Sequence, residues 1–252
     1  MNLFLSIILL LLLIVIAGKR GLKAFLTIYI NLALVFILII IIGWGFNPLI
    51  HAFIIGLIIS LVILFMLNGF NKKTISSFIS VFILLLIFII VTILVSKRIY
   101  MHGYSEESIV SVVYLNYNCG IDMMSLFSAV VIIGLLGNIV DTSIAISSAL
   151  FEVYDNNKHL TKKELFISGM NIGKDILGTT TNTLFFAYLG GFMTLILFFI
   201  DRSFTFSNII NSKIFSIEFT RIILSGMASF IIIPLTSIVT SILLTHIKKD
   251  LE

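Results

Sequence analysis

Charged residues, prolines and cysteines are scarce in this sequence of 252 residues. Charged residues make up 11% of the chain and hydrophobic residues 60%, whereas a soluble domain has about 25% charged and about 45–50% apolar residues. The composition therefore excludes an ordinary soluble domain and indicates an integral membrane protein. The single cysteine, Cys119, cannot form an internal disulfide. Of the 2 prolines, Pro234 lies within an apolar run, and it predicts a bend in a helix there.

Sequence motifs for enzymatic chemistry are also absent. The chain has no phosphate-binding loop and no nucleophile motif, and no basic face of a soluble domain that would suit nucleic acid. The histidines are scattered and show no metal-binding pattern: His51, His102, His159 and His246. We therefore expect a protein that is not an enzyme and has no metal, no cofactor and no nucleic-acid partner. Its expected surrounding is the lipid bilayer.

Seven predominantly apolar runs follow one another along the chain, and a membrane-spanning helix needs about 20 such residues. They lack the alternation of a membrane β-barrel, so the sequence predicts an all-α, polytopic membrane helix bundle of about seven transmembrane helices. We expect one domain over residues 1–252, with four spans in 1–100 and a core of three spans in 123–252. The runs cover residues 3–17, 24–44, 49–67, 76–96, 123–151, 176–200 and 222–245.

Basic residues alternate between the two faces of this arrangement. The connections that follow odd-numbered runs hold eleven Lys and Arg residues, and those on the other face hold five. Because basic residues favour the cytoplasmic side, the N-terminus is expected outside and the C-terminus in the cytoplasm. The first run has no basic residues before it and is followed by Lys19, Arg20 and Lys23, which favours a retained anchor over a cleaved signal peptide.

Two connections are long enough to carry structure of their own. Residues 97–122, on the outer side, are compatible with a short strand, a hairpin or an interfacial helix. Residues 154–175, on the inner side, contain Thr161 and Glu164 at the spacing of a capping box, which predicts a helix beginning at about Lys162. Apolar residues on one side of that helix suggest that it lies along the inner interface before the sixth span.

The stretch "GLLGNIVDTSIAISSALFEV", residues 134–153, holds an aspartate inside an apolar run. Small and polar residues recur there at spacings of three and four, so they share one face of a helix. The opposite side is aliphatic, and we expect it to face lipid while the polar stripe faces another helix or water. The stripe comprises Gly134, Asn138, Asp141, Ala145, Ser148 and Glu152, and the aliphatic side comprises Ile132, Leu135, Leu136, Ile139 and Leu150.

The sixth and seventh runs repeat this pattern, whereas the first four carry little polarity. We expect the sixth run to place Asn171, Asp175, Gly178 and Asn182 on one stripe, flanked by Thr179, Thr180, Thr181 and Thr183. The seventh contributes a looser set: Ser225, Gly226, Ser229, Thr236, Ser237, Thr240 and Ser241. Any site is therefore expected in the last three helices.

Asp141 is the residue on which a functional reading depends. A carboxylate at the centre of a membrane helix costs about 2.5–3.5 kcal/mol, and intramembrane ionisable residues usually have a function. The alternative is a structural aspartate hydrogen-bonded to Asn182. Asp175 has its own alternative, an interfacial charge paired with Lys174. The expected ion-coupling path comprises Asp141, Asn138, Ser148, Asp175, Thr179, Asn182 and Thr183, and the expected helix-packing glycines are Gly134, Gly137, Gly169, Gly173 and Gly178.

Two segments of the chain, 134–153 and 168–191, resemble the YibE/F family of bacterial membrane proteins. The first matches the family pattern at Ile146, Ser147, Ser148, Ala149 and Glu152. The second matches at Gly169, Ile172, Gly173, Asp175, Ile176, Gly178, Thr179, Thr181, Asn182, Thr183, Leu184, Ala187 and Tyr188, while Lys174 replaces an arginine. The resemblance implies a multi-pass protein of the bacterial cytoplasmic membrane. The length is similar to the shorter, YibF-like member, which implies a membrane partner of the YibE type; the family supplies no activity.

A weaker resemblance is to the membrane core of the SecD/SecF and resistance-nodulation permeases, in which an acidic helix and its neighbour relay protons. The large outer domain of those proteins is missing here, so the resemblance implies that a partner supplies it. It is an analogy at the level of fold.

Three functions follow as hypotheses. The first is a membrane transport component with Asp141 as the coupling group, and the second is a scaffold that docks another membrane protein. The third is an intramembrane aspartyl protease, which needs two carboxylates sharing a proton. The sequence argues against it, because Asp175 follows Gly173-Lys174 where such enzymes have a G-x-G-D motif.

Overall fold

The computed structural model describes residues 2–98, 122–201 and 203–249, and all regular elements in these ranges are helical. The expected all-α bundle is therefore confirmed. The helices are α1 (Asn2–Ala17), α2 (Lys19–Gly43), α3 (Pro48–Leu61) with a π-helical extension η1 (Val62–Met66), α4 (Lys72–Arg98), α6 (Met123–Asn156), α7 (Lys162–Asp201), α8 (Phe206–Asn211) and α9 (Lys213–Lys249).

Each of the seven apolar runs forms a helix, but not all of these helices are long enough to cross a membrane by themselves. Within the described ranges, five are long and apolar enough, and α7 makes a sixth if its two parts, which meet at 48° near residue 194, are one span. Helix α1 has 16 residues, or about 24 Å at 1.5 Å per residue, against a hydrocarbon core of about 30 Å. A seventh span formed by α1 stays a prediction.

Local capping interactions set where several helices begin. The side chain of Asn47 accepts hydrogen bonds from the backbone amides of Leu49 and Ile50 at 3.0 and 3.3 Å, and Pro48 occupies the first turn of α3, where its missing N–H costs nothing. The carboxylate of Asp122 caps α6 in the same way. The polar residues before these runs therefore fix the ends of the spans.

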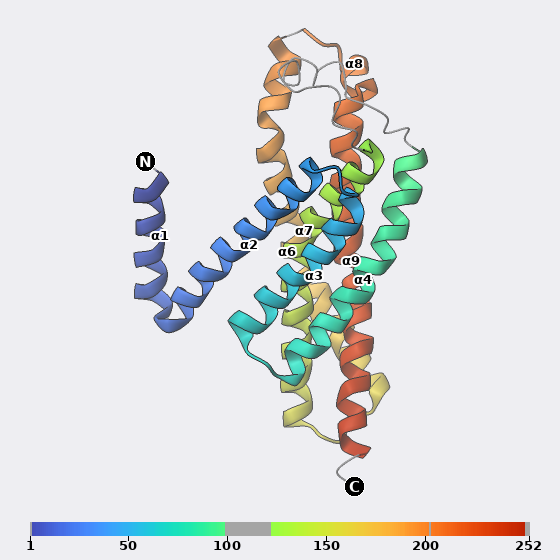
Figure 1. The fold of residues 1–252 in the computed structure, drawn as a ribbon. Coiled ribbons are helices and arrows are strands. Elements are labelled where there is room, and N and C mark those ends of the chain that lie inside the picture. Colours follow the sequence, from blue (N-terminus) through green and yellow to red (C-terminus); the bar gives the residue numbers. More distant parts are fainter. Residues whose placement is uncertain (1, 99–121, 202, 250–252) are drawn as a thin grey trace.

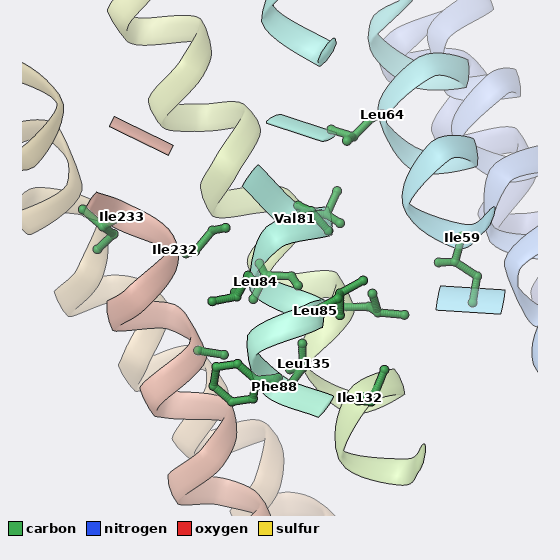
Figure 2. Close-up of a cluster of buried hydrophobic side chains, with 14 of the residues drawn as sticks. Ile59, Leu64, Val81, Leu84, Leu85, Phe88, Ile132, Leu135, Ile232 and Ile233 are labelled. Carbon is green, nitrogen blue, oxygen red and sulfur yellow. The ribbon is translucent and has the colours of Figure 1, made fainter. Parts of the chain in front are cut away.

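The core lies where α3, α4, α6 and α9 meet. Figure 2 shows aliphatic and aromatic side chains of these helices and of η1 pointing toward one another. Leu84, Leu85 and Phe88 of α4 are fully buried, as are Leu135 of α6 and Ile232 of α9. The N-terminal helices α3 and α4 thus share one core with α6 and α9, because α4 packs against both α6 and α9 and α3 packs against α6.

Helices α1 and α2 extend away from this bundle (Figure 1). They pack against each other at Gly21, where an added Cβ atom would lie 1.9 Å from the carbonyl oxygen of Leu13. The hydroxyl of Tyr29 also donates a hydrogen bond to Ser6 Oγ at 2.6 Å. Most of the long side chains of this pair are exposed, which suits a surface in contact with lipid.

The start of α7 confirms one expectation and corrects another. Thr161 and Glu164 form the capping box: the backbone N–H of Thr161 donates to Glu164 Oε2 at 2.8 Å, and the N–H of Glu164 donates to Thr161 Oγ1 at 3.3 Å. The helix then begins at Lys162, as predicted. The expected separate interfacial helix was wrong, because α7 continues through residue 175 with Gly169 and Gly173 packed against α9.

Two further expectations concern Pro234 and the outer connection. Pro234 lies inside α9, which is helical on both sides of it, and no break in the helix is assigned there. Residues 99–121, which make up most of the outer connection, lie outside the described residues.

The ends of the bundle separate the two groups of connections that the charge count distinguished. In Figure 1 the α1–α2, α3–α4 and α6–α7 connections and the end of α9 lie toward the lower end, and α8 lies at the upper end. The structure therefore agrees that successive connections alternate between the two ends of the bundle. Which side of the membrane each end faces stays a prediction.

Candidate polar groove between helices α6 and α7

The aliphatic side of helix α6 faces the bundle and not lipid, which corrects the expectation for that side, while the polar stripe lines a groove beside α7. The aliphatic residues expected to face lipid are buried among α3, α4 and α9; Ile132, Leu135 and Ile139 have no exposed surface. The stripe that includes Gly134, Asp141 and Ala145 is exposed instead. The physical reason is that an aliphatic side can pack equally well against lipid or against other helices, so its composition alone does not tell which one it meets.

The exposed stripe forms one wall of a groove of about 590 Å³ between α6 and α7. Asp141 lies in this wall with its side chain exposed to the groove. Helix α7 supplies three threonines and two aliphatic residues to the opposite wall. The full lining is Gly134, Gly137, Asn138, Asp141, Thr142, Ala145, Ile176, Thr179, Thr180, Thr183 and Leu184.

Two hydrogen bonds connect the three helices beside one end of the groove. The Nδ2 amide of Asn138 on α6 donates to Ser229 Oγ on α9. The hydroxyls of Tyr188 on α7 and Ser225 on α9 are 2.7 Å apart. Ser229 Oγ also donates to the backbone oxygen of Ser225 at 3.0 Å. We call these four residues, Asn138, Tyr188, Ser225 and Ser229, the clasp.

The glycines of α6 and α7 fall into two groups. A Cβ atom added to Gly169 would lie 2.5 Å from Ser237 Oγ, and one added to Gly173 would lie 2.1 Å from Ile233 Cγ2. These two glycines lie where α7 packs closely against α9. Gly137 and Gly178 have no atoms within 4 Å of such a Cβ, so the packing role expected for them does not apply among the described residues, and Gly134 only approaches the Tyr188 hydroxyl, at 3.6 Å.

The structure brings together four of the seven residues expected on the ion-coupling path, namely Asp141, Asn138, Thr179 and Thr183. Ser148, Asp175 and Asn182 lie outside the lining of the groove. Asn182 is exposed and makes no hydrogen bond to Asp141, so the alternative of a structural Asp141–Asn182 pair is wrong. Asp175 and Lys174 are likewise exposed and do not form an ion pair.

Sequence reasoning missed polar residues on α4. Ser76, Ser77 and Ser80 are fully buried, although polarity was expected only in the last three helices. Ser76 Oγ lies 2.6 Å from Thr240 Oγ1 of α9, and Ser147 Oγ of α6 donates to the carbonyl oxygen of Lys73 at 3.0 Å. The α4 serines lie at the start of the run 76–96, which was taken to carry little polarity because the rest of it is apolar. The close spacing of the three serines at 76, 77 and 80 was the feature of the sequence that could have indicated a polar contact there.

The comparisons with known proteins identify the family. A family model described as YibE/F-like protein matches residues 5–246. The chain belongs to the YibE/F-like family. The match extends well beyond the two segments that carried the resemblance, and it reaches from within α1 to within α9. No curated protein and no solved structure matches the chain, so the analogy with the SecD/SecF and resistance-nodulation permease core rests on sequence alone.

The groove of this YibE/F-like chain contains few kinds of polar functional group. One carboxylate, one amide and the hydroxyls of four threonines supply oxygen acceptors and hydrogen-bond donors. Asp141 can take up and release a proton there, or attract a cation. Among the residues that the structure describes, no three His, Cys, Asp or Glu residues lie close enough together to hold a metal ion.

Proposed function

We propose that this YibE/F-like protein is a component of a transport system in the bacterial cytoplasmic membrane, with Asp141 as its ion- or proton-coupling group. The observation that supports the proposal is the position of Asp141. Its carboxyl group lies in a groove lined by Asn138, Thr179 and Thr183, within a helix long and apolar enough to span the membrane.

The energetic argument concerns what surrounds this carboxyl group. Facing hydrocarbon, a carboxylate near the middle of a span would cost about 2.5–3.5 kcal/mol. Water and hydroxyl groups in the groove reduce that cost, and so does protonation of the carboxyl group. A group whose charge is so dependent on its surroundings can couple protonation to a change of conformation.

The proposal includes no catalytic step. An aspartyl protease would require a second carboxyl group beside Asp141, and Asp175, the aspartate of α7 nearest in sequence to the groove lining, is not part of that lining.

A scaffold is the second candidate, and the exposed glycines favour it. Gly137 and Gly178 leave space on facing helices where a further helix could approach closely. A membrane partner of the YibE type would then cover the groove. Purification of the chain alone and together with the product of a neighbouring gene separates a self-sufficient carrier from a scaffold that is stable only as a complex.

The coupling role is tested by replacing Asp141 in a strain that lacks the native chain. Asp141→Asn keeps the size of the side chain and removes its proton chemistry, so it should insert and fold normally and fail to restore the deletion phenotype. Asp155→Asn, at an exposed position near the end of α6, is the matched control and should restore it. Full restoration by both Asp141→Asn and Asp141→Ala would eliminate the coupling role.

A further inference from the structure

The two ends of the α6–α7 groove differ in polarity. Toward the α6–α7 connection, exposed polar side chains continue beyond the groove, with Glu152 on α6 and Asn171 and Asp175 on α7. These residues lead from Ala145 and Ile176 in the groove lining to the end of the bundle. Water can therefore approach Asp141 from this end along polar surface.

At the opposite end the groove lining stops beside the clasp, and apolar side chains follow. Gly134 is the last α6 residue of the groove lining, and its Cα faces the Tyr188 hydroxyl closely enough that an added Cβ would lie 3.6 Å from it. Beyond Tyr188 lies an apolar cavity of about 300 Å³ between α7, α8 and α9, lined by residues such as Phe185, Leu189 and Phe192. Its single charged lining residue, Glu218, is paired with Arg221 at 2.8 Å.

The chemistry of the clasp also prevents a proton from passing along it. A proton relay needs atoms that both accept and donate, as hydroxyl oxygens do, whereas the amide nitrogen of Asn138 only donates. The next hydroxyl, that of Ser229, donates to the backbone carbonyl of Ser225 instead of to another hydroxyl. The hydrogen bonds of the clasp therefore connect α6, α7 and α9 without linking Asp141 to the far side.

We propose that Tyr188 and Ser225 determine the side of the membrane from which Asp141 is reached. Their hydrogen bond holds α7 against α9 and keeps the groove open only toward the α6–α7 connection; breaking it lets α7 separate from α9 and opens the groove toward α8. This inference rests on the proposed function, since it assigns the gate of the same groove. Tyr188 and Ser225 act by positioning α7.

The test uses accessibility of a thiol placed in the groove. Cys119, the only cysteine, is replaced by serine, and Gly137→Cys introduces a thiol in the groove lining, where a Cβ meets no atom within 4 Å. Reaction rates with a charged, membrane-impermeant thiosulfonate are measured in sealed vesicles of both orientations. The thiol should react from the side of the α6–α7 connection.

Tyr188→Phe should then raise the rate from the α8 side about threefold, the fold-change that corresponds to the ~0.6 kcal/mol average of a hydrogen bond between membrane helices. Ser225→Ala should do the same, and the double variant should add nothing, because both substitutions remove one bond. Tyr29→Phe is the matched control: it removes a tyrosine hydrogen bond to a serine far from the groove and should leave both rates unchanged.

Three results would overturn the gate: equal rates from both sides with the clasp intact, no reaction from either side, or an unchanged rate from the α8 side in Tyr188→Phe and Ser225→Ala. These outcomes are independent of the complementation by Asp141 variants. If Asp141→Asn fails to complement while the clasp variants leave the sidedness unchanged, the coupling role stands and the gate is wrong. If the sidedness shifts as expected while Asp141→Asn and Asp141→Ala both complement, the gate stands and the coupling role is wrong.

Discussion

Gly173 is a residue at which the packing of α7 on α9 leaves no space for a side chain. A Cβ added there would lie 2.1 Å from Ile233 Cγ2, whereas one added to Gly178, five residues further along the same helix, meets nothing within 4 Å. The two positions therefore form a matched pair for testing whether α7 is docked as the structure has it.

Gly173→Ala should lower the free energy of unfolding by about 1–3 kcal/mol, the usual cost of overpacking. Gly178→Ala should be neutral or stabilising by up to about 1 kcal/mol, because alanine favours the helix. The midpoint of thermal unfolding in detergent, followed by circular dichroism, measures both. Adding Ile233→Ala to Gly173→Ala should recover part of the loss; equal midpoints for the two alanine variants would mean that α7 does not pack on α9 at this point.

For single residues, the sequence predicted correctly which side chains share one face of α6. It predicted less well whether a face contacts lipid, water or another helix. Spacings of three and four placed Asn138 and Asp141 together, and the structure puts both in the groove. The environment of the opposite, aliphatic face was predicted wrongly, because in a membrane both lipid and protein are apolar. Contacts with the distant helices α3, α4 and α9 decide it, and periodicity within one helix does not contain them.

Among the elements, α7 shows how a local signal and distant packing combine. Its first residue was predictable because the capping box is a short-range interaction between Thr161 and Glu164. Its continuation past Asp175 was not, because close packing of Gly169 and Gly173 on α9 keeps the chain helical where the composition suggested an interfacial segment. The short helix α8 was not predicted for a related reason: six residues carry too little periodicity to recognise.

The capping box gives a prediction for the beginning of α7. Thr161→Ala removes the side-chain acceptor of the Glu164 amide and should destabilise the first turn by about 0.5–2 kcal/mol. Hydrogen exchange of the amides in residues 162–165 should then be faster by a factor of about 2–30. Thr161→Ser keeps the acceptor and should exchange nearly as slowly as the native chain. Fast exchange in both variants would show that the cap is not formed in the membrane.

For the whole molecule, the number of membrane spans depends on α1. Five helices, or six with the bent α7, meet the length and composition of a span among the described residues, and α1 is shorter. The composition predicted the helix bundle reliably, because a run of about 20 apolar residues usually forms a membrane-spanning helix. It could not decide how α1 and α2 extend from the core, since α1 and the part of α2 beyond its basic first turn are mostly apolar.

Reporter fusions at the two ends test the predicted topology. If α1 crosses the membrane, seven spans place the N-terminus outside and the C-terminus in the cytoplasm. A reporter active only outside the cytoplasm should then work at the N-terminus and fail at the C-terminus. Activity at neither end would indicate six spans with both ends in the cytoplasm, and activity at the C-terminus would contradict the orientation expected from the basic residues.

The central claim is that Asp141 faces a water-filled groove within the membrane and does not face lipid. Carboxyl labelling in native membranes tests it, with a water-soluble and a lipid-soluble carbodiimide used in parallel and modified residues located by mass spectrometry. Asp155, exposed near the end of α6, serves as the reference for a fully hydrated carboxyl group. The account predicts that the water-soluble reagent modifies Asp141 as well as Asp155. Modification of Asp141 by the lipid-soluble reagent alone would contradict it.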